Sequence, residues 1–224
     1  DSMPLGWHCI TYQIIFSSGS VSTPLSIIAG PTADLSDMWL GDANLSGIDL
    51  SGADLTNVEA YYLSACPALL PENWRCLRGA LIGPTARLGD YMVGANLSGA
   101  DLSGADLSGA DLRSTDFSEA DLSGADLNGV NSVYANMNGA NLINANLSFS
   151  TMSYLDLVDA DLSGADLSGA VGWYADFSGA DLGYANLTGA NLMESNFDGV
   201  IWNQTICPDG TNSDDNGDTC ENNL

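Results

Sequence analysis

The chain of 224 residues is long enough for one domain with appendages, and its 29 acidic side chains against four arginines give it a net charge of −25. This charge excludes ordinary nucleic-acid binding, which needs clustered cations opposite the phosphates, and it also disfavours anionic membrane surfaces. A hydrophobic content of 45% argues against disorder. No apolar run reaches the roughly 18 residues that predict insertion into a bilayer.

Residues 1–32 precede the repetitive part of the chain and contain two motifs that recur later. A Trp-X-Cys motif at residues 7–9 matches residues 74–76, and a Gly-Pro-Thr-Ala motif at residues 30–33 matches residues 83–86. The offset between the copies is 67 at the Trp and 53 at the Gly, so the first of two predicted modules carries 14 extra residues. We interpret residues 1–32 as an N-terminal cap segment.

The first motif contains two residues with reactive side chains, His8 and Cys9. His8 is the only histidine and stands where the other copy has an arginine, so it is expected to be solvated rather than catalytic. Cys9 aligns with Cys76, whose predicted partner is Cys66, and the equivalent partner of Cys9 would lie just upstream of Asp1. The alignment predicts that the chain begins inside a module, and a bond from Cys9 to one of the other four cysteines would contradict this.

Residues 33–57 form the first of two runs in which a large apolar residue, here called the centre, recurs every five positions. Residues 58–80 interrupt the pattern with a segment rich in Pro, Trp and Cys, which is predicted to be a loop insertion. The second run spans residues 81–202. Of its 22 centres between Leu97 and Trp202, 14 are Leu, and 16 have Ala two positions earlier, so the pattern is strict enough to dictate the fold.

A period of five fits neither regular element of secondary structure. On a helix, five residues advance the azimuth by about 140° beyond a full turn, so the centres would wind around the whole surface. In a strand, an odd period places successive centres on opposite faces. The chain must therefore bend once per repeat, with Gly near the bends, so that every centre points toward one axis. Because a single coil cannot bury its own centres, successive coils must stack.

The repeated Ala-(Asp/Asn)-Leu-X-X pattern, as at residues 95–99 and 100–104, resembles the pentapeptide repeat family. The resemblance covers residues 33–57 and about 77–202. It implies an all-β fold, a right-handed quadrilateral β-helix with about 20 residues per coil, to which we add a disulfide-bearing loop and caps.

Residues 203–224 are polar and turn-rich, and we predict that they form a C-terminal cap, because the end of a coil stack needs a cover. Cys207 and Cys220 in this segment, and Cys66 and Cys76 in the loop insertion, each close a short loop. Both pairs are predicted to be disulfides, with reduced buried thiols as the alternative. Disulfides favour a secreted, periplasmic or cell-surface protein.

The C-terminal segment also resembles an acidic calcium loop, because side-chain oxygens occur at alternate positions. The candidate ligands are Asn212, Asp214, Asn216 and Asp218. The match to an EF-hand is poor, since Asn223 stands where that motif has Glu. No cofactor is predicted, and calcium is the alternative left open.

With four pentapeptides in each coil, equivalent positions of successive coils fall in columns. The Asp or Asn before each centre recurs wherever the repeat does, so these residues are expected to satisfy turn amides and keep the protein soluble, with cation binding as the alternative. The two residues after each centre are mostly Ser-Gly on three faces. On the fourth face they include larger side chains, namely Val133, Tyr134, Tyr154, Trp173, Tyr174 and Met193.

Three tyrosines of this fourth face, Tyr134, Tyr154 and Tyr174, recur at every fourth repeat and are predicted to stack in one exposed column. Beneath them, Ser132 and Gly172 occupy centre positions on either side of Met152, whose flexible side chain is expected to fill the space they leave.

An aromatic, nearly uncharged strip on an acidic protein is typical of an interface, with a purely structural aromatic ladder as the alternative. We therefore expect a non-catalytic, extracytoplasmic module for adhesion or self-assembly, whose partner is a protein or a second copy, or else a glycan. The chain shows no catalytic motif, so no enzymatic activity is predicted.

The family resemblance implies another function. Some pentapeptide repeat proteins resemble B-form DNA in shape and charge and protect topoisomerases from quinolones. The acidic character of the chain fits that function, whereas disulfides do not fit the cytosol in which a topoisomerase works.

Overall fold

The computed structural model describes residues 8–12, 25–88 and 92–220, with the backbone alone for residues 8–12 and 25–28. The chain divides into two compact units, Asp1–Leu88 and Gly89–Leu224. In the described part of the chain, no helix is long and apolar enough to cross a membrane.

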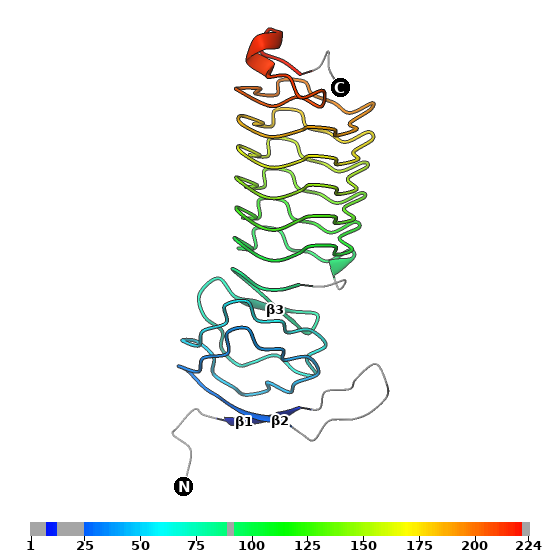
Figure 1. Cartoon of the computed structure of the whole chain (residues 1–224). Helices are drawn as coiled ribbons and strands as arrows, with labels where there is room; N and C mark the ends of the chain where they lie inside the picture. Colours follow the sequence, from blue (N-terminus) through cyan, green and yellow to red (C-terminus); the bar gives the residue numbers. More distant parts are fainter. Residues whose placement is uncertain (1–7, 13–24, 89–91, 221–224) are drawn as a thin grey trace. The chain divides into compact units, whose positions relative to one another are not determined.

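The second unit is a stack of coils (Figure 1). Isolated parallel bridges join residues that are 20 positions apart, from Asn96 with Asp116 to Asn186 with Ile206. Two hydrogen bonds form each junction: the N–H of a centre donates to a carbonyl of the next coil, as from Leu97 to Asp116 at 2.7 Å, and the N–H of Asp116 donates back to Ala95 at 2.9 Å. Each coil therefore contains four pentapeptides and bonds to its neighbours along four lines.

The interior of the second unit consists of the centres and the residues two positions before them. All 22 centres between Leu97 and Trp202 are buried, and nearly all the alanines of the pattern are fully enclosed as well. Large centres fill the middle of the coil and small alanines allow the chain to turn close to the axis, which is why the two sizes alternate in the sequence.

The bends are two-residue turns whose second residue has a positive φ. Gly occupies 11 of the 22 such positions that follow the centres from Leu97 to Trp202, for example Gly104 with φ 66° and Gly129 with φ 66°. This left-handed conformation is open to Gly without a steric penalty, which explains the Ser-Gly recurrence. Several other residues adopt it too, including Tyr134 with φ 61° and Tyr184 with φ 61°. Because side chains at this position project outward, the surface of the coil stack can vary while its interior stays constant.

The Asp or Asn before each centre stabilises the turn that follows. Its Oδ1 accepts the N–H of the residue two positions later, as from Ser103 to Asp101 at 3.1 Å and from Ser168 to Asp166 at 2.9 Å. The expected role of these residues in satisfying turn amides is confirmed. It explains why Asp and Asn, whose short side chains reach this amide, dominate the position.

The first unit contains a shorter stack. Its parallel bridges join Asp34 with Asp54 and Trp39 with Glu59, 20 positions apart, whereas Asn44 pairs with Ala65, 21 positions apart. The centres of the first run form its buried core, and Trp39 and Trp74 pack against that core while partly exposed. Asp49 pairs with Leu69, again 20 positions apart, so the extra residue before Ala65 is offset by a shorter step before Leu69 in the Pro- and Cys-rich segment.

Two antiparallel hairpins in the first unit correspond to the duplicated motifs. Strands β1 (His8–Tyr12) and β2 (Leu25–Ala29) pair, as do β3 (Arg75–Leu77) and β4 (Ala80–Ile82) (Figure 1). His8 lies opposite Ala29, and Arg75 lies opposite Ile82. These pairs occupy equivalent positions of the two copies, so the hairpins share one register and the extra residues of the first module fall in the connection of the first hairpin.

Residues 81–88 lie with the first unit, although the repeat pattern assigns them to the main run. Leu81 donates its N–H to Ala60 at 2.9 Å, and Arg87 donates to Val58 at 3.0 Å. These bonds attach β4 and the segment that follows it to the first stack, which a five-residue pattern alone does not reveal.

Candidate functional site

The three predicted tyrosines form a stacked column, which we call the tyrosine ladder (Tyr134, Tyr154, Tyr174). The ring centroids of Tyr134 and Tyr154 are 4.9 Å apart with an interplanar angle of 15°, and those of Tyr154 and Tyr174 are 5.2 Å apart at 13°. Each tyrosine is the second residue of its turn and donates its backbone N–H to the next coil, as from Tyr154 to Trp173 at 2.9 Å. The ring spacing therefore follows the spacing of the coils.

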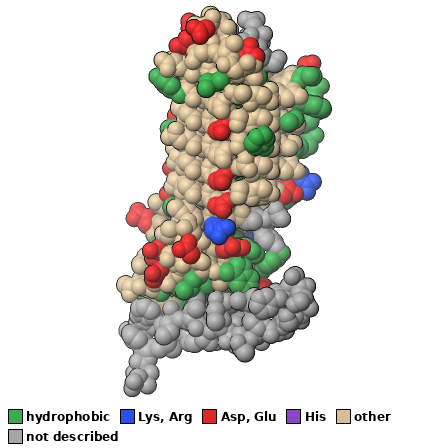
Figure 2. All heavy atoms as spheres, in the orientation of Figure 1, with side chains coloured by type: hydrophobic (Ala, Val, Ile, Leu, Met, Phe, Trp, Pro, Cys, Tyr) green, Lys and Arg blue, Asp and Glu red, His purple; other side chains and the backbone are tan. Residues whose placement is uncertain are grey.

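The ladder lies at the protein surface. The exposed fractions are 62% for Tyr134, 48% for Tyr154 and 51% for Tyr174. Trp173 and Met193 are also exposed, and Val133 is half-buried. Together these six residues form what we call the aromatic face, and Figure 2 shows hydrophobic side chains gathered along one edge of the second unit. Because Tyr154 has a ring on each side, its outward parts are the ring edge and the hydroxyl.

The aromatic face carries little charge beyond Glu194, which is exposed at the turn position one coil after Tyr174. The residues that precede its centres are Asp111, Asn131, Thr151, Val171 and Asn191. Asp111 is paired with Arg113 through a 2.6 Å ion pair. Hydrogen bonding from the Arg113 guanidinium holds the pKa of the Asp111 carboxyl below its ordinary value and raises that of Arg113. The column from Asn131 to Asn191 therefore contains no carboxylate, in contrast to the other three columns.

The core beneath the ladder contains unusual centres. Ser132 and Gly172 lie on either side of Met152, and all three are buried. A Cβ added to Gly172 would lie 2.7 Å from Cγ of Met152 and 2.9 Å from Cδ2 of Leu192. The expectation that Met152 fills the space is thus confirmed, and Leu192 contributes from the other side.

Two exposed aromatic residues on other faces escaped the sequence analysis. Phe149 is 70% exposed and Tyr184 is 59% exposed, and both have a positive φ at the second position of a turn. A Cβ at Gly169 would lie 2.8 Å from the ring of Phe149, so this ring lies over the turn of the next coil. Both residues stand at the turn position where the repeat often has Gly, and this substitution is the sequence feature that could have predicted their exposure. The other faces are therefore acidic with isolated aromatic residues.

The acidic columns are interrupted by asparagines that donate hydrogen bonds to neighbouring carboxylates. The Nδ2 of Asn136 donates to Asp116 at 3.1 Å, and Asn141 donates to Asp121 at 3.1 Å, one coil apart in each case. Asn146 and Asn186 make the same bond to the coil below. These bonds reduce repulsion between stacked carboxylates. No group of three or more His, Cys, Asp or Glu side chains suited to a metal ion occurs among the described residues.

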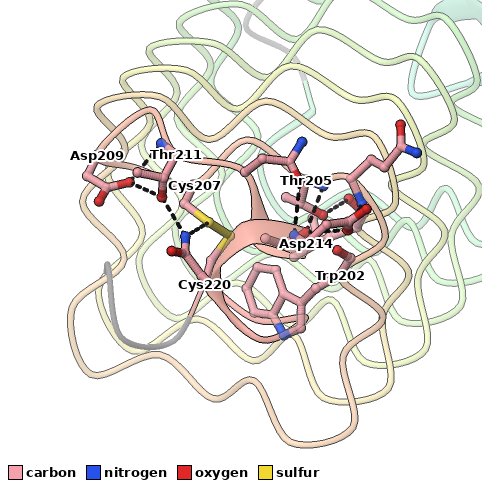
Figure 3. The surroundings of a disulfide bond; sticks show 12 residues. Trp202, Thr205, Cys207, Asp209, Thr211, Asp214 and Cys220 are labelled. Atoms are coloured by element: carbon pink, nitrogen blue, oxygen red, sulfur yellow. Dashed lines mark hydrogen bonds between the residues drawn. A yellow bond between two sulfur atoms is a disulfide. The ribbon is translucent and has the colours of Figure 1, made fainter.

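Three of the four calcium candidates of the C-terminal segment form hydrogen bonds within the protein. Figure 3 shows one of them, Asp214, close to Thr205 and Trp202. Asn212 precedes the short 3-10 helix η2 (Ser213–Asn216) and accepts the N–H of Asp214 at 2.9 Å. Asp214 accepts the N–H of Gln204 at 2.8 Å, and Asn216 donates to Thr211 at 2.6 Å. Asp218 lines a shallow pocket beside Trp202. The oxygens of Asn212 and Asp214 thus organise a turn over the last coil.

Both predicted disulfides are present. Cys66 and Cys76 are joined with a Cα–Cα distance of 5.9 Å, and Cys207 and Cys220 with 5.3 Å. Cys207 is also buried at the position of a centre, one coil after Leu187. The side chain of Cys9 lies outside the described residues. The other four cysteines are bonded to one another, so none of them is its partner.

Comparisons with known proteins agree with the repeat pattern. The family model for pentapeptide repeats matches eight copies, at residues 33–60, 91–131, 133–170 and 174–201, which is more than half of the chain. No curated protein matches the chain.

Several solved structures are similar. A pentapeptide repeat protein, Rfr23, from the cyanobacterium Cyanothece 51142 is 27% identical over 48% of this chain and 84% of its own, with a TM-score of 0.35. One from the thylakoid lumen of Arabidopsis thaliana is 27% identical over 60% and 79%, with a TM-score of 0.23. QnrB1, a plasmid-mediated fluoroquinolone resistance protein, is 18% identical over 51% and 86%, with a TM-score of 0.23.

Proposed function

Because the chain belongs to the pentapeptide repeat family, whose members form right-handed quadrilateral β-helices and are generally structural rather than enzymatic, we propose that it is a non-catalytic, extracytoplasmic interaction module. Its aromatic face associates with the same face of a second copy. The observation that carries this proposal is the tyrosine ladder, a row of exposed, parallel rings beside the column from Asn131 to Asn191, which contains no carboxylate.

The charge of the chain supports contact at this face. Two copies with a net charge of −25 each repel one another at most approaches. The acidic columns place carboxylates such as Asp161 and Asp181 on neighbouring coils. Only the aromatic face combines apolar area with a column from Asn131 to Asn191 that carries no acid, so repulsion is least and the burial of apolar surface most favourable there.

The geometry of the rings supports a second copy rather than a glycan. Sugars pack their C–H groups on the faces of aromatic rings, whereas both faces of Tyr154 are covered by its neighbours. What the ladder presents is a row of edges and hydroxyls that repeats once per coil. A second copy has the same coil repeat, so its side chains meet this row in register.

The extracytoplasmic location rests on the cysteines. Cys66–Cys76 and Cys207–Cys220 are both bonded, and stable disulfides are rare where thioredoxin and glutathione keep thiols reduced. One bridge lies in the irregular segment of the first unit, and the other ties Cys220 of the C-terminal segment to Cys207 at a centre position of the last coil. In both cases covalent closure of a loop restrains the unfolded chain.

Replacing Tyr134, Tyr154 and Tyr174 together by Ser is expected to convert an associating protein into a monomer, because the exposed apolar area of the face is lost while the core is untouched. Sedimentation velocity over a concentration series measures this. Tyr184→Ser is the matched control, since Tyr184 has the same turn conformation and similar exposure on another face. Wild-type protein that stays monomeric throughout the series, or a triple variant that sediments like wild type, contradicts the proposal.

The acidic coil stack favours one other function, that of a DNA mimic which protects a topoisomerase. The two functions differ in the redox state that they require. Thiol titration of the denatured, non-reduced protein is expected to find at most one thiol, that of Cys9. Four or five free thiols would place the protein in a reducing compartment and favour the DNA mimic.

A further inference from the structure

The tyrosine ladder has a chemical property that contact with a partner does not use. We propose that it is a site of oxidative cross-linking, at which a one-electron oxidant such as an extracellular haem peroxidase with hydrogen peroxide joins two of its phenol rings within one chain. The inference does not rest on the proposed self-association, because the reacting rings belong to the same chain.

The first argument is proximity. The ring centroids are held 4.9 Å and 5.2 Å apart by the backbone hydrogen bonds between coils. Two rings fixed at this separation react with each other at an effective concentration far above that of separate molecules in dilute solution. The side chains project from exposed turns, so their ring carbons can approach without any change in the buried core.

The second argument is access. About half or more of each ladder tyrosine is exposed, which leaves the hydroxyls within reach of an oxidant in solution. Trp173 is exposed beside Tyr174 and is a second oxidisable ring on the same turn. Because Tyr154 stacks on both neighbours, a radical formed at any ring of the ladder has another phenol beside it.

The electrons and protons of the reaction balance between two phenols and one hydrogen peroxide, so the protein supplies no further reactive group. Each of two tyrosines loses one electron and its phenolic proton to give a phenoxyl radical. The two radicals form one carbon–carbon bond between ring carbons ortho to the oxygens, and the hydrogens on those carbons move to the oxygens as aromaticity returns. The peroxide takes up the two electrons and two protons and leaves as two molecules of water.

The chain provides a matched control for exposure alone. Tyr184 has a φ of 61°, like the ladder residues, and is 59% exposed. Among the described residues, no aromatic ring stacks on it. If exposure were sufficient, Tyr184 would be modified as readily as the ladder, whereas a requirement for adjacent rings leaves it uncoupled.

The test treats the full chain, at a concentration where it sediments as a monomer, with a haem peroxidase and limiting peroxide. Dityrosine fluorescence and mass spectrometry of the digested product locate the bond, which lowers the mass of the joined peptides by two hydrogens. Mapping also separates the ladder from the edge-to-face pair Tyr61–Tyr62. The expected product is a chain of monomer size with two ladder peptides joined.

Tyr154→Phe is the decisive variant, because it keeps the stacked ring and removes only the hydroxyl between Tyr134 and Tyr174. The yield of intrachain product is expected to fall about tenfold, as proximity is lost. Tyr184→Phe is expected to leave the yield unchanged. An undiminished yield in Tyr154→Phe, products that join only separate chains, or coupling that maps to Tyr184 would each overturn the proposal.

Discussion

Met152→Ala is expected to lower the free energy of unfolding toward the upper end of the range of about 2–5 kcal/mol for such a truncation. Met152 lies between two undersized centres, and its side chain occupies the space that Gly172 leaves. Removing it leaves a cavity that Ser132 and Gly172 are too small to fill. Urea denaturation measures the change.

Met137→Ala is the matched control for this substitution. Met137 is a fully buried centre as well, but the equivalent centres of the adjacent coils are the large residues Phe117 and Leu157. These side chains can relax into part of the vacated volume, so Met137→Ala is expected to cost less than Met152→Ala. An equal or larger cost at Met137 would contradict the assignment of Met152 as the residue that fills the gap.

A double-mutant cycle with Gly172 tests the same contact from the other side. Gly172→Leu alone is expected to cost about 1–3 kcal/mol through overpacking, since even a Cβ there would lie 2.7 Å from Cγ of Met152. In the Met152→Ala background the new leucine fills the cavity. The cost of the double variant is therefore expected to be smaller than the sum of the single costs, by about 0.5–3 kcal/mol.

Replacing both Cys207 and Cys220 by Ala is expected to lower the free energy of unfolding by about 3 kcal/mol, the value for a loop of similar length. The bridge holds the C-terminal segment against the last coil, where Ser213 donates its N–H to Thr205 at 2.9 Å and Cys207 donates to Thr211 at 2.8 Å. Without the bridge, the last coil is expected to open first, because coils of a solenoid are stabilised only by their neighbours.

Hydrogen exchange locates this effect. The amide of Leu187, which donates to Ile206 at 2.8 Å, is expected to lose protection, while amides in the middle of the stack such as Leu142 retain theirs. The corresponding Ala replacements at Cys66 and Cys76 lie in the first unit and serve as control. Unchanged protection at Leu187 would mean that the C-terminal segment does not restrain the last coil.

The ladder and the disulfides are the parts of the candidate site that could be predicted from sequence. Once four pentapeptides close each coil, Tyr134, Tyr154 and Tyr174 must lie above one another, whatever their side chains do. The bonded cysteines are close in sequence and flank turn-rich segments, so their pairing needs no knowledge of distant contacts.

Other parts could not be predicted because they depend on the direction of a flexible side chain. Asn212, Asp214 and Asn216 alternate as in a cation loop, yet they bond to backbone amides and to Thr211. The oxygens are equally suited to an ion and to an amide, and the nearness of Gln204 on the last coil decides the partner of Asp214. Phe149 was missed because one aromatic residue in a column has no periodic neighbour.

By itself, the sequence determined that the chain bends once per repeat and that its coils stack, because a period of five cannot bury Leu and Ala in a helix or a flat strand. The count of four pentapeptides per coil came from the resemblance to the pentapeptide repeat family. That count determined which residues share a column. Only the tertiary structure decided that the segment after β4 joins the first unit and that asparagines donate hydrogen bonds to the carboxylates of the coil below. These features arise from contacts between coils. Several side chains there have similar chemistry, and packing and hydrogen-bond geometry, rather than the local pattern, decide which of them contact each other.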